Sequence, residues 1–196
     1  MTRYLRLGLV LVLAELAMGC ATPGGRWSAV DSVTPTAEVG RFSIAMPAGW
    51  MRLSQEDANR ILLSRDGVNL QIIEIVCAKG DNAFPRIKRS IPSSVLASEL
   101  AELQLAEMRA SPAMDNLEVV KNEPATIAAK SSYMLHVRYK NARGLRYERI
   151  VYGFVEADSY YTLTYQAPTL HYFTRDRGQF DDLLRSLHAS NKPKST

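Results

Sequence analysis

The chain has few of the side chains that build redox, metal or disulfide-stabilised sites. Its 196 residues include two cysteines, Cys20 and Cys77, and three histidines, which are His136, His171 and His188. The histidines are far apart in the sequence without metal-ligand spacing, and no Cys-x-x-Cys motif is present. These absences argue against a metal centre, and the sequence predicts no cofactor.

Motifs that place a catalytic group or a phosphate are also missing. The sequence contains no Gly-x-Ser-x-Gly elbow, no His-Glu-x-x-His motif and no glycine-rich phosphate loop. His136 alternates with the apolar Leu135 and Val137, as a histidine on the face of a strand does. His171, beside aromatic residues, could line a pocket but does not make a site alone. We predict a protein that is not an enzyme, with a site of dispersed catalytic residues as the weakest alternative.

No apolar run is long enough to span a bilayer as a helix, which takes about 20 residues. The most apolar stretch, residues 7–14, follows Arg3 and Arg6 and precedes Gly19 and Cys20. A basic start, a short apolar core and a small residue before a cysteine form the pattern of a bacterial lipoprotein signal. We predict that residues 1–19 are a cleaved signal peptide and that Cys20 carries lipid, including palmitate.

Three residues depart from the usual lipoprotein pattern. Ala17 stands three residues before the cysteine, where Leu, Val or Ile is usual, Met18 is unusual in the next place, and Glu15 interrupts the apolar stretch just before the cleavage box. The alternative is an ordinary signal peptide cut near Ala17 or Ala21, which leaves a secreted protein. If Cys20 is lipidated, Cys77 has no disulfide partner and is expected to be a small core residue.

Composition is that of one domain with a weakly basic charge. The net charge is +4 and 46% of the residues are hydrophobic, enough for a core. Residues 20–39 are rich in Pro, Gly, Ser and Thr and predict a flexible, lipid-anchored tether. The domain is expected over residues 40–189, followed by a polar tail over 190–196. The export signal argues against nucleic acid as a partner.

The hydrophobic periodicity changes twice along the predicted domain. Alternation predicts a strand over 41–46, a long central strand over 68–77 and a meander within 132–166. A helical stripe predicts a helix over 93–110, long enough to cross a sheet, and residues 179–188 predict a short closing helix. This order predicts an α+β fold: a single antiparallel sheet with a long helix packed across it and a C-terminal helix.

Two stretches of this domain have a distinctive order of residues. Phe42–Trp50 (FSIAMPAGW) joins a strand to Pro, Gly and Trp, and Tyr160–Pro168 (YYTLTYQAP) is followed by the apolar residues of the closing helix. With the order of elements, they resemble the PsbP/DcrB-like α/β domains over residues 40–188. The resemblance implies a PsbP/DcrB-like sandwich. It also implies the mostly non-enzymatic roles of that family, which are those of accessory subunits, small regulators and bacterial lipoproteins. It transfers no functional residue.

Basic residues surround the predicted turn between the last long strands. They are Arg138, Lys140, Arg143 and Arg146, with Arg149 further along. On a membrane-tethered protein these side chains can contact anionic lipid or polysaccharide. The alternative is that they protect the sheet from pairing with other sheets and keep the protein soluble.

The leading functional prediction is a non-catalytic, lipid-anchored accessory or assembly factor of the cell envelope that binds a protein partner. The residue after Cys20 is not acidic, which favours the outer membrane, facing the periplasm, in a Gram-negative source. The alternative is a periplasmic lipoprotein that binds a small ligand, an anionic glycan or a lipid. Its pocket would lie between the helix at 93–110 and the sheet.

Overall fold

The computed structural model describes residues 25–31, 36–54, 57, 59–92 and 94–190. Cys20, the predicted signal peptide and residues 191–196 lie outside this part of the chain. No helix within it is long and apolar enough to cross a membrane.

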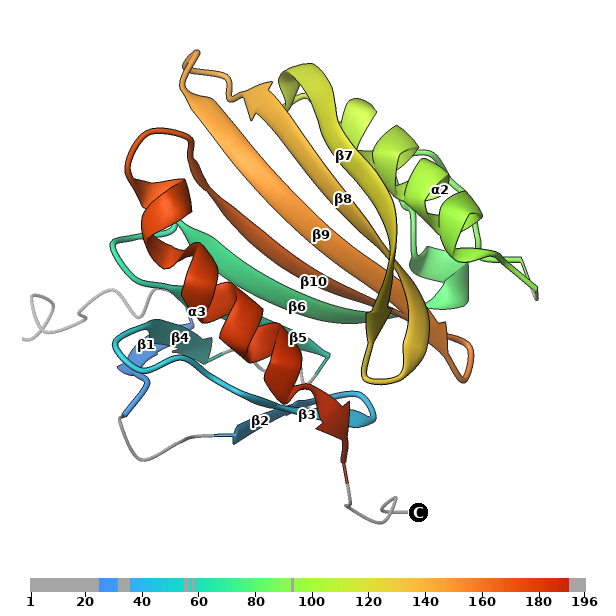
Figure 1. The fold of residues 1–196 in the computed structure, drawn as a ribbon, viewed down its shortest axis with the longest axis horizontal. Coiled ribbons are helices and arrows are strands. Elements are labelled where there is room, and N and C mark those ends of the chain that lie inside the picture. Colours follow the sequence, from blue (N-terminus) through green and yellow to red (C-terminus); the bar gives the residue numbers. More distant parts are fainter. Residues whose placement is uncertain (1–24, 32–35, 55–56, 58, 93, 191–196) are drawn as a thin grey trace, which may run out of the picture.

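An antiparallel sheet of eight strands forms the body of the domain (Figure 1). In order across the sheet, its strands are β1 (Arg26–Ala29), β4 (Met51–Ser54), β5 (Arg60–Ser64), β6 (Ile72–Lys79), β10 (Ser159–Pro168), β9 (Arg146–Glu156), β8 (Lys130–Lys140) and β7 (Asp115–Ile127). A second sheet of three strands contains β11 (His188–Ala189), β3 (Phe42–Ala45) and β2 (Thr36–Val39). The predicted single sheet is therefore two sheets.

Two helices cover opposite faces of the large sheet. Helix α2 (Ala97–Arg109) packs on β7, β8 and β9, and helix α3 (Tyr172–Ser186) packs on β10 and on β3 of the small sheet (Figure 1). A short 3-10 turn, η1 (Gly80–Asn82), follows β6. Because strand side chains alternate between faces, each face has its own apolar core. The core under α3 includes Trp50, Phe154 and Phe180, and the core under α2 includes Leu105 and Val151.

The interior strands follow the predicted alternation. Strand β6 lies between β5 and β10, which confirms a central strand, although it begins at Ile72 rather than at residue 68. Strands β8, β9 and β10 form the predicted meander. The α+β class is confirmed, with a large antiparallel sheet and two helices.

Both helices begin at residues other than those predicted. The predicted helix over 93–110 starts only at Ala97, because the Glu99 carboxylate accepts the Leu96 N–H at 2.8 Å and Leu96 itself is extended. With 13 residues, α2 covers one part of the sheet, so a long helix across the whole sheet is not confirmed. Helix α3 starts at Tyr172 instead of residue 179, and its first two turns bury Phe173 and the charged Asp176. A carboxylate within the buried stripe hides the helical period of these turns from the sequence.

The predicted tether contains two strands, so this part of the prediction was wrong. Residues 26–29 form β1, which pairs with β4, and Val30 after it is buried. Residues 36–39 form β2, which buries Ala37 and Val39 against the core under α3. Composition alone missed these strands because a few apolar side chains among many polar ones are enough to attach short edge strands.

Candidate functional site

A cleft of about 320 Å³ lies between the C-terminal half of α2 and the sheet. This is the place predicted for a small-ligand pocket, and the volume lies at the lower end of the range of about 300–1,000 Å³ typical of ligand sites. Its polar lining comes from α2, from the loop before it and from β8, β9 and β10. The side chains used below are Arg86, Gln104, Glu107, Tyr139, Arg149 and Gln166.

Arg149 lies on β9, directly opposite Gln166 of β10 in the strand register. Its Nε donates to Gln166 Oε1 at 2.8 Å, and Nη2 donates to the same oxygen. The guanidinium carbon lies 5.8 Å from the centre of the Tyr139 ring. Among the residues that the structure describes, no carboxylate forms an ion pair with Arg149, although its side chain is half-buried.

The second arginine of the cleft is neutralised. Arg86 Nη1 donates to Glu107 Oε1 at 3.0 Å, and the backbone N–H groups of Arg86 and Ile87 also donate to this carboxylate. Glu107 lies on α2 and is buried, so these hydrogen bonds from the loop before α2 compensate its buried negative charge. The positive charge left over in the cleft is therefore that of Arg149.

Aromatic side chains form the floor beside Arg149. Tyr139 and Tyr147 are both buried and their rings stack with centroids 5.7 Å apart. Burial raises the pKa of Tyr139 above its ordinary value, although the Arg149 charge lowers it. Tyr139 thus keeps its proton at neutral pH. Tyr147 donates from its hydroxyl to the Asn69 carbonyl, which joins β9 to the turn between β5 and β6.

The structure keeps Lys140, Arg143 and Arg146 at one turn, and the fourth predicted basic residue, Arg138, is neutralised by an ion pair. Arg138 on β8 forms an ion pair with Glu148 at 3.5 Å. The Glu148 carboxylate also forms a hydrogen bond with His136 Nε2 at 2.6 Å. Lys140 and Arg146 lie opposite each other at the end of the β8–β9 ladder, on the face turned away from α2. Arg143 lies in the turn between them, which begins at Asn141.

Strand alternation places Arg149 on the α2 face, where it enters the cleft, and Arg146 on the other. Arg149 is one of the basic residues of the sequence near the turn, but it is not among the predicted site residues. The signal that could have found it is its spacing from Tyr147 and Val151, which share its face and are buried under α2.

The three histidines lie on different elements of the fold. His136 lies on a sheet face, stacked on the Phe173 ring with centroids 5.4 Å apart, and burial lowers its pKa despite the Glu148 contact, which raises it. His171 is at the start of α3 and His188 is in β11. In the described part of the chain, no group of three or more His, Cys, Asp or Glu side chains could hold a metal ion.

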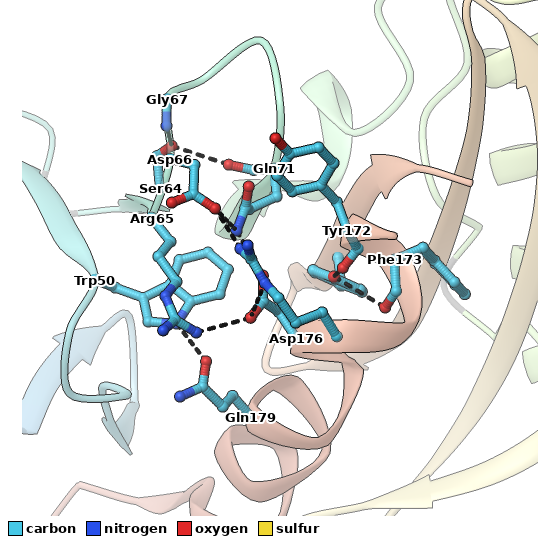
Figure 2. A network of polar contacts seen from close by, with 12 residues as sticks. Trp50, Ser64, Arg65, Asp66, Gly67, Gln71, Tyr172, Phe173, Asp176 and Gln179 are labelled. Atoms are coloured by element: carbon cyan, nitrogen blue, oxygen red, sulfur yellow. Dashed lines mark hydrogen bonds and ion pairs between the residues drawn. The ribbon is translucent and has the colours of Figure 1, made fainter. Parts of the chain in front are cut away.

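A buried ionic network fixes the turn between β5 and β6 to the first turns of α3 (Figure 2). Asp176 is fully buried and accepts from Arg65 Nη1 at 2.8 Å, from Arg175 Nη2 at 2.6 Å and from Gln71 Nε2 at 2.5 Å. Asp66 pairs with Arg175, which lowers the pKa of the Asp66 carboxyl. Because two arginines balance two aspartates, this network holds the fold together and leaves no free charge for a ligand.

Cys77 is a half-buried thiol without a disulfide in the described chain. A Cβ at Gly40 would approach its sulfur at 2.8 Å, which shows how closely the turn between β2 and β3 covers it. Gly40 has a φ of +56°, so glycine satisfies both the backbone and the space there. The predicted role of a small packed residue accords with this position.

The architecture defines an α+β sandwich in which a large antiparallel sheet carries one helix on each face. No family model matches the chain, and no curated protein matches its sequence. Solved structures do match. The chain is similar to cyanobacterial PsbP (CyanoP) from Synechocystis sp. PCC 6803, with 11% identity, a TM-score of 0.53 and coverage of 89% of this chain and 98% of that one.

Two further solved structures share the arrangement. The Ran-binding protein Mog1p of Saccharomyces cerevisiae matches with 10% identity and a TM-score of 0.52, over 80% of this chain and 96% of that one. A protein of unknown function from Pseudomonas aeruginosa matches with 10% identity and a TM-score of 0.51, over 82% of this chain and 99% of that one. The chain therefore has the PsbP/Mog1-like fold, which confirms the resemblance seen in the sequence.

Proposed function

We propose that this protein is a non-catalytic, lipid-anchored protein of the cell envelope that binds an acidic ligand in the cleft under α2. The lipid would be attached at Cys20 and hold the domain at the outer membrane, facing the periplasm. The signal pattern before Cys20 supports the anchor. The geometry of the cleft supports the binding role, and it favours the small-ligand alternative over the leading prediction from sequence.

The observation that carries this proposal is the unpaired charge of Arg149. Placing a guanidinium in a half-buried site without an acidic partner is unfavourable, because the charge loses water and gains little in return. A ligand carboxylate or phosphate would supply the missing partner, and arginine binds both groups through its planar fork. The amide of Gln166 and the hydroxyl of Tyr139 would then lie beside the bound anion.

Binding of simple acids tests the cleft. We expect octanoate or glycerol phosphate to raise the melting temperature of the protein in a concentration-dependent manner, whereas octanol and glycerol do not. The Arg149→Gln variant should bind the active acid at least about 30-fold more weakly, because it removes one partner of a charge-assisted pair. Titration calorimetry would give the dissociation constants.

The matched control is Arg146→Gln on the same strand. Arg146 is exposed and lies on the other face of β9, so its loss should leave the affinity of the cleft unchanged. If neither acid binds to the wild type, or if Arg149→Gln binds as well as the wild type, the proposed ligand site is wrong.

The lipid anchor is tested separately by mass and membrane fractionation. In a bacterial host we expect the mature wild type to begin at Cys20, to carry acyl chains and to remain with the membranes. Cys20→Ser should lack the acyl mass because it has no thiol to modify. A soluble, unmodified wild type cut at another residue would contradict the anchor without affecting the cleft.

An accessory role with a protein partner is the second candidate, and the edge strand β7 favours it. Among the described strands, this one of 13 residues has β8 as its single neighbour, and its Val119 and Val120 side chains are each 40% exposed. An open strand edge can accept a strand from another protein. This candidate becomes the lead if the cleft binds no acid.

A further inference from the structure

Three turns meet at one end of the large sheet, here called the loop end. They are the β5–β6 turn (65–71), the β8–β9 turn (141–145) and the β10–α3 turn (169–171). The Thr169 N–H donates to the Arg146 carbonyl at 3.0 Å, which joins the last two turns, and Tyr147 donates to Asn69 of the first. In Figure 1, the β8–β9 and β10–α3 turns lie together at the upper left.

Large apolar side chains are exposed at this end. Leu170 is 82% exposed, the highest value for a large hydrophobic residue in the described chain, and Leu145 and Val68 are each 46% exposed. One residue from each turn therefore presents an apolar side chain to the outside. Single exposed apolar residues are common, but a group of them at one end indicates a contact surface.

The backbone holds Leu170 outward at an energetic cost. The next residue, His171, has φ +70° and ψ −58°, and the Tyr172 N–H donates to the Leu170 carbonyl at 2.8 Å. This is a γ-turn of the rare, strained form. Residues in such conformations concentrate at functional positions, where the surrounding structure maintains them. The turn starts α3, whose second residue Phe173 is buried, and it leaves the Leu170 side chain in solvent.

Positive charge accompanies these apolar residues. Arg143 and Arg146 flank Leu145, and neither forms an ion pair with a carboxylate of the described chain. The nearby Asp66 is already paired with Arg175. Lys140 lies opposite Asp115 in the strand register, so part of its charge is balanced. Two unpaired arginines around an exposed leucine are suited to a surface that is negative outside and apolar beneath.

We infer that the loop end docks on the surface of an anionic bilayer, with Leu145 and Leu170 in the interface and Arg143 and Arg146 against lipid phosphates. The arginines lie next to the leucines. When the leucines enter the interface, the arginine charges come within about 8 Å of the lipid phosphates, which is the Debye length at physiological salt. Docking at this end turns the C-terminal end of α2 and the start of β7 toward the membrane. It needs neither a ligand in the cleft nor the covalent lipid.

Sedimentation with vesicles tests the docking. The protein for this assay is the chain from residue 20 with Cys20→Ser, which keeps the helices and strands that the structure describes, since these lie within 26–189. We expect it to bind vesicles of phosphatidylcholine with phosphatidylglycerol and not vesicles of phosphatidylcholine alone. Binding should weaken as the salt concentration rises. Leu170→Ser should weaken it about tenfold, and Arg143→Gln about fivefold.

Matched substitutions at the opposite end are the controls. Leu96 precedes α2 and is 67% exposed, and Arg185 belongs to the last turn of α3. Leu96→Ser and Arg185→Gln should bind vesicles like the wild type, as should the cleft variant Arg149→Gln. Absence of binding to the anionic vesicles, equal binding to both kinds, or equal losses from the control variants would each overturn the proposal. None of these outcomes bears on acid binding in the cleft.

Discussion

At the scale of single residues, one buried carboxylate connects elements that are far apart in the sequence. Asp176 of α3 is fully buried, and its partners Arg65 and Gln71 lie at the two ends of the β5–β6 turn. Gln71 is also buried, and its Oε1 has no hydrogen-bond partner. Its amide nitrogen is oriented by Asp176 and Asp66 together, which explains why the oxygen is left unpaired.

Removing the Asp176 carboxylate should therefore destabilise the protein strongly. We expect Asp176→Ala to lower the free energy of unfolding by about 3–5 kcal/mol, because two arginines and a buried amide lose their common acceptor. For a chain of this length the loss corresponds to a fall in melting temperature of about 10 °C. Differential scanning calorimetry would measure it.

A second aspartate on α3 provides the control for this prediction. Asp182 also pairs with an arginine, Arg185, but both side chains are about 70% exposed. Asp182→Ala should change the free energy of unfolding by no more than about 0.5 kcal/mol. Equal effects of the two substitutions would mean that burial of the Asp176 network contributes nothing to the free energy of unfolding.

At the scale of elements, the sequence predicted the strands better than the ends of the helices. The alternation over 132–166 is regular because β8, β9 and β10 each place one face against α2 and the other against α3 or solvent. The start of α3 was missed because its first turns bury a charged residue, Asp176, between Phe173 and Phe180, and a carboxylate at that position interrupts the apolar stripe. The start of α2 depends on one side chain, Glu99, that folds back on the Leu96 N–H.

The candidate site was predicted only in part, because the strand register that decides which basic residue enters the cleft cannot be seen in the sequence. A pocket under the helix was expected, but the basic residues near the turn were treated as one group. Which of them faces α2 depends on the register of β8 with β9, and the register places Arg149 in the cleft and Arg146 outside it. The network around Asp176 brings together the β5–β6 turn and α3, and no local pattern signals such a contact.

At the scale of the whole molecule, the two cores share the same strands. Strand β9 places Ile150 and Phe154 in the core under α3, and places Tyr147 and Val151 in the core under α2. Loss of packing on one face of the sheet destabilises strands against which the core on the other face also packs. The domain should therefore unfold as a single cooperative unit, as single domains of this size usually do.

A substitution under α2 should consequently be detected from the other face. Leu105→Ala, at a residue 4% exposed, should cost about 2–5 kcal/mol. Trp50 is fully buried under α3, with its Nε1 donating to Gln179 Oε1 at 2.8 Å. If the sheet couples the two faces, tryptophan fluorescence and far-ultraviolet circular dichroism will report one shifted midpoint in guanidinium chloride. Leu96→Ala, at an exposed position, should leave that midpoint in place. A dichroism midpoint that falls while the fluorescence midpoint stays would show that α2 unfolds by itself, and the cleft could then open without loss of the sheet.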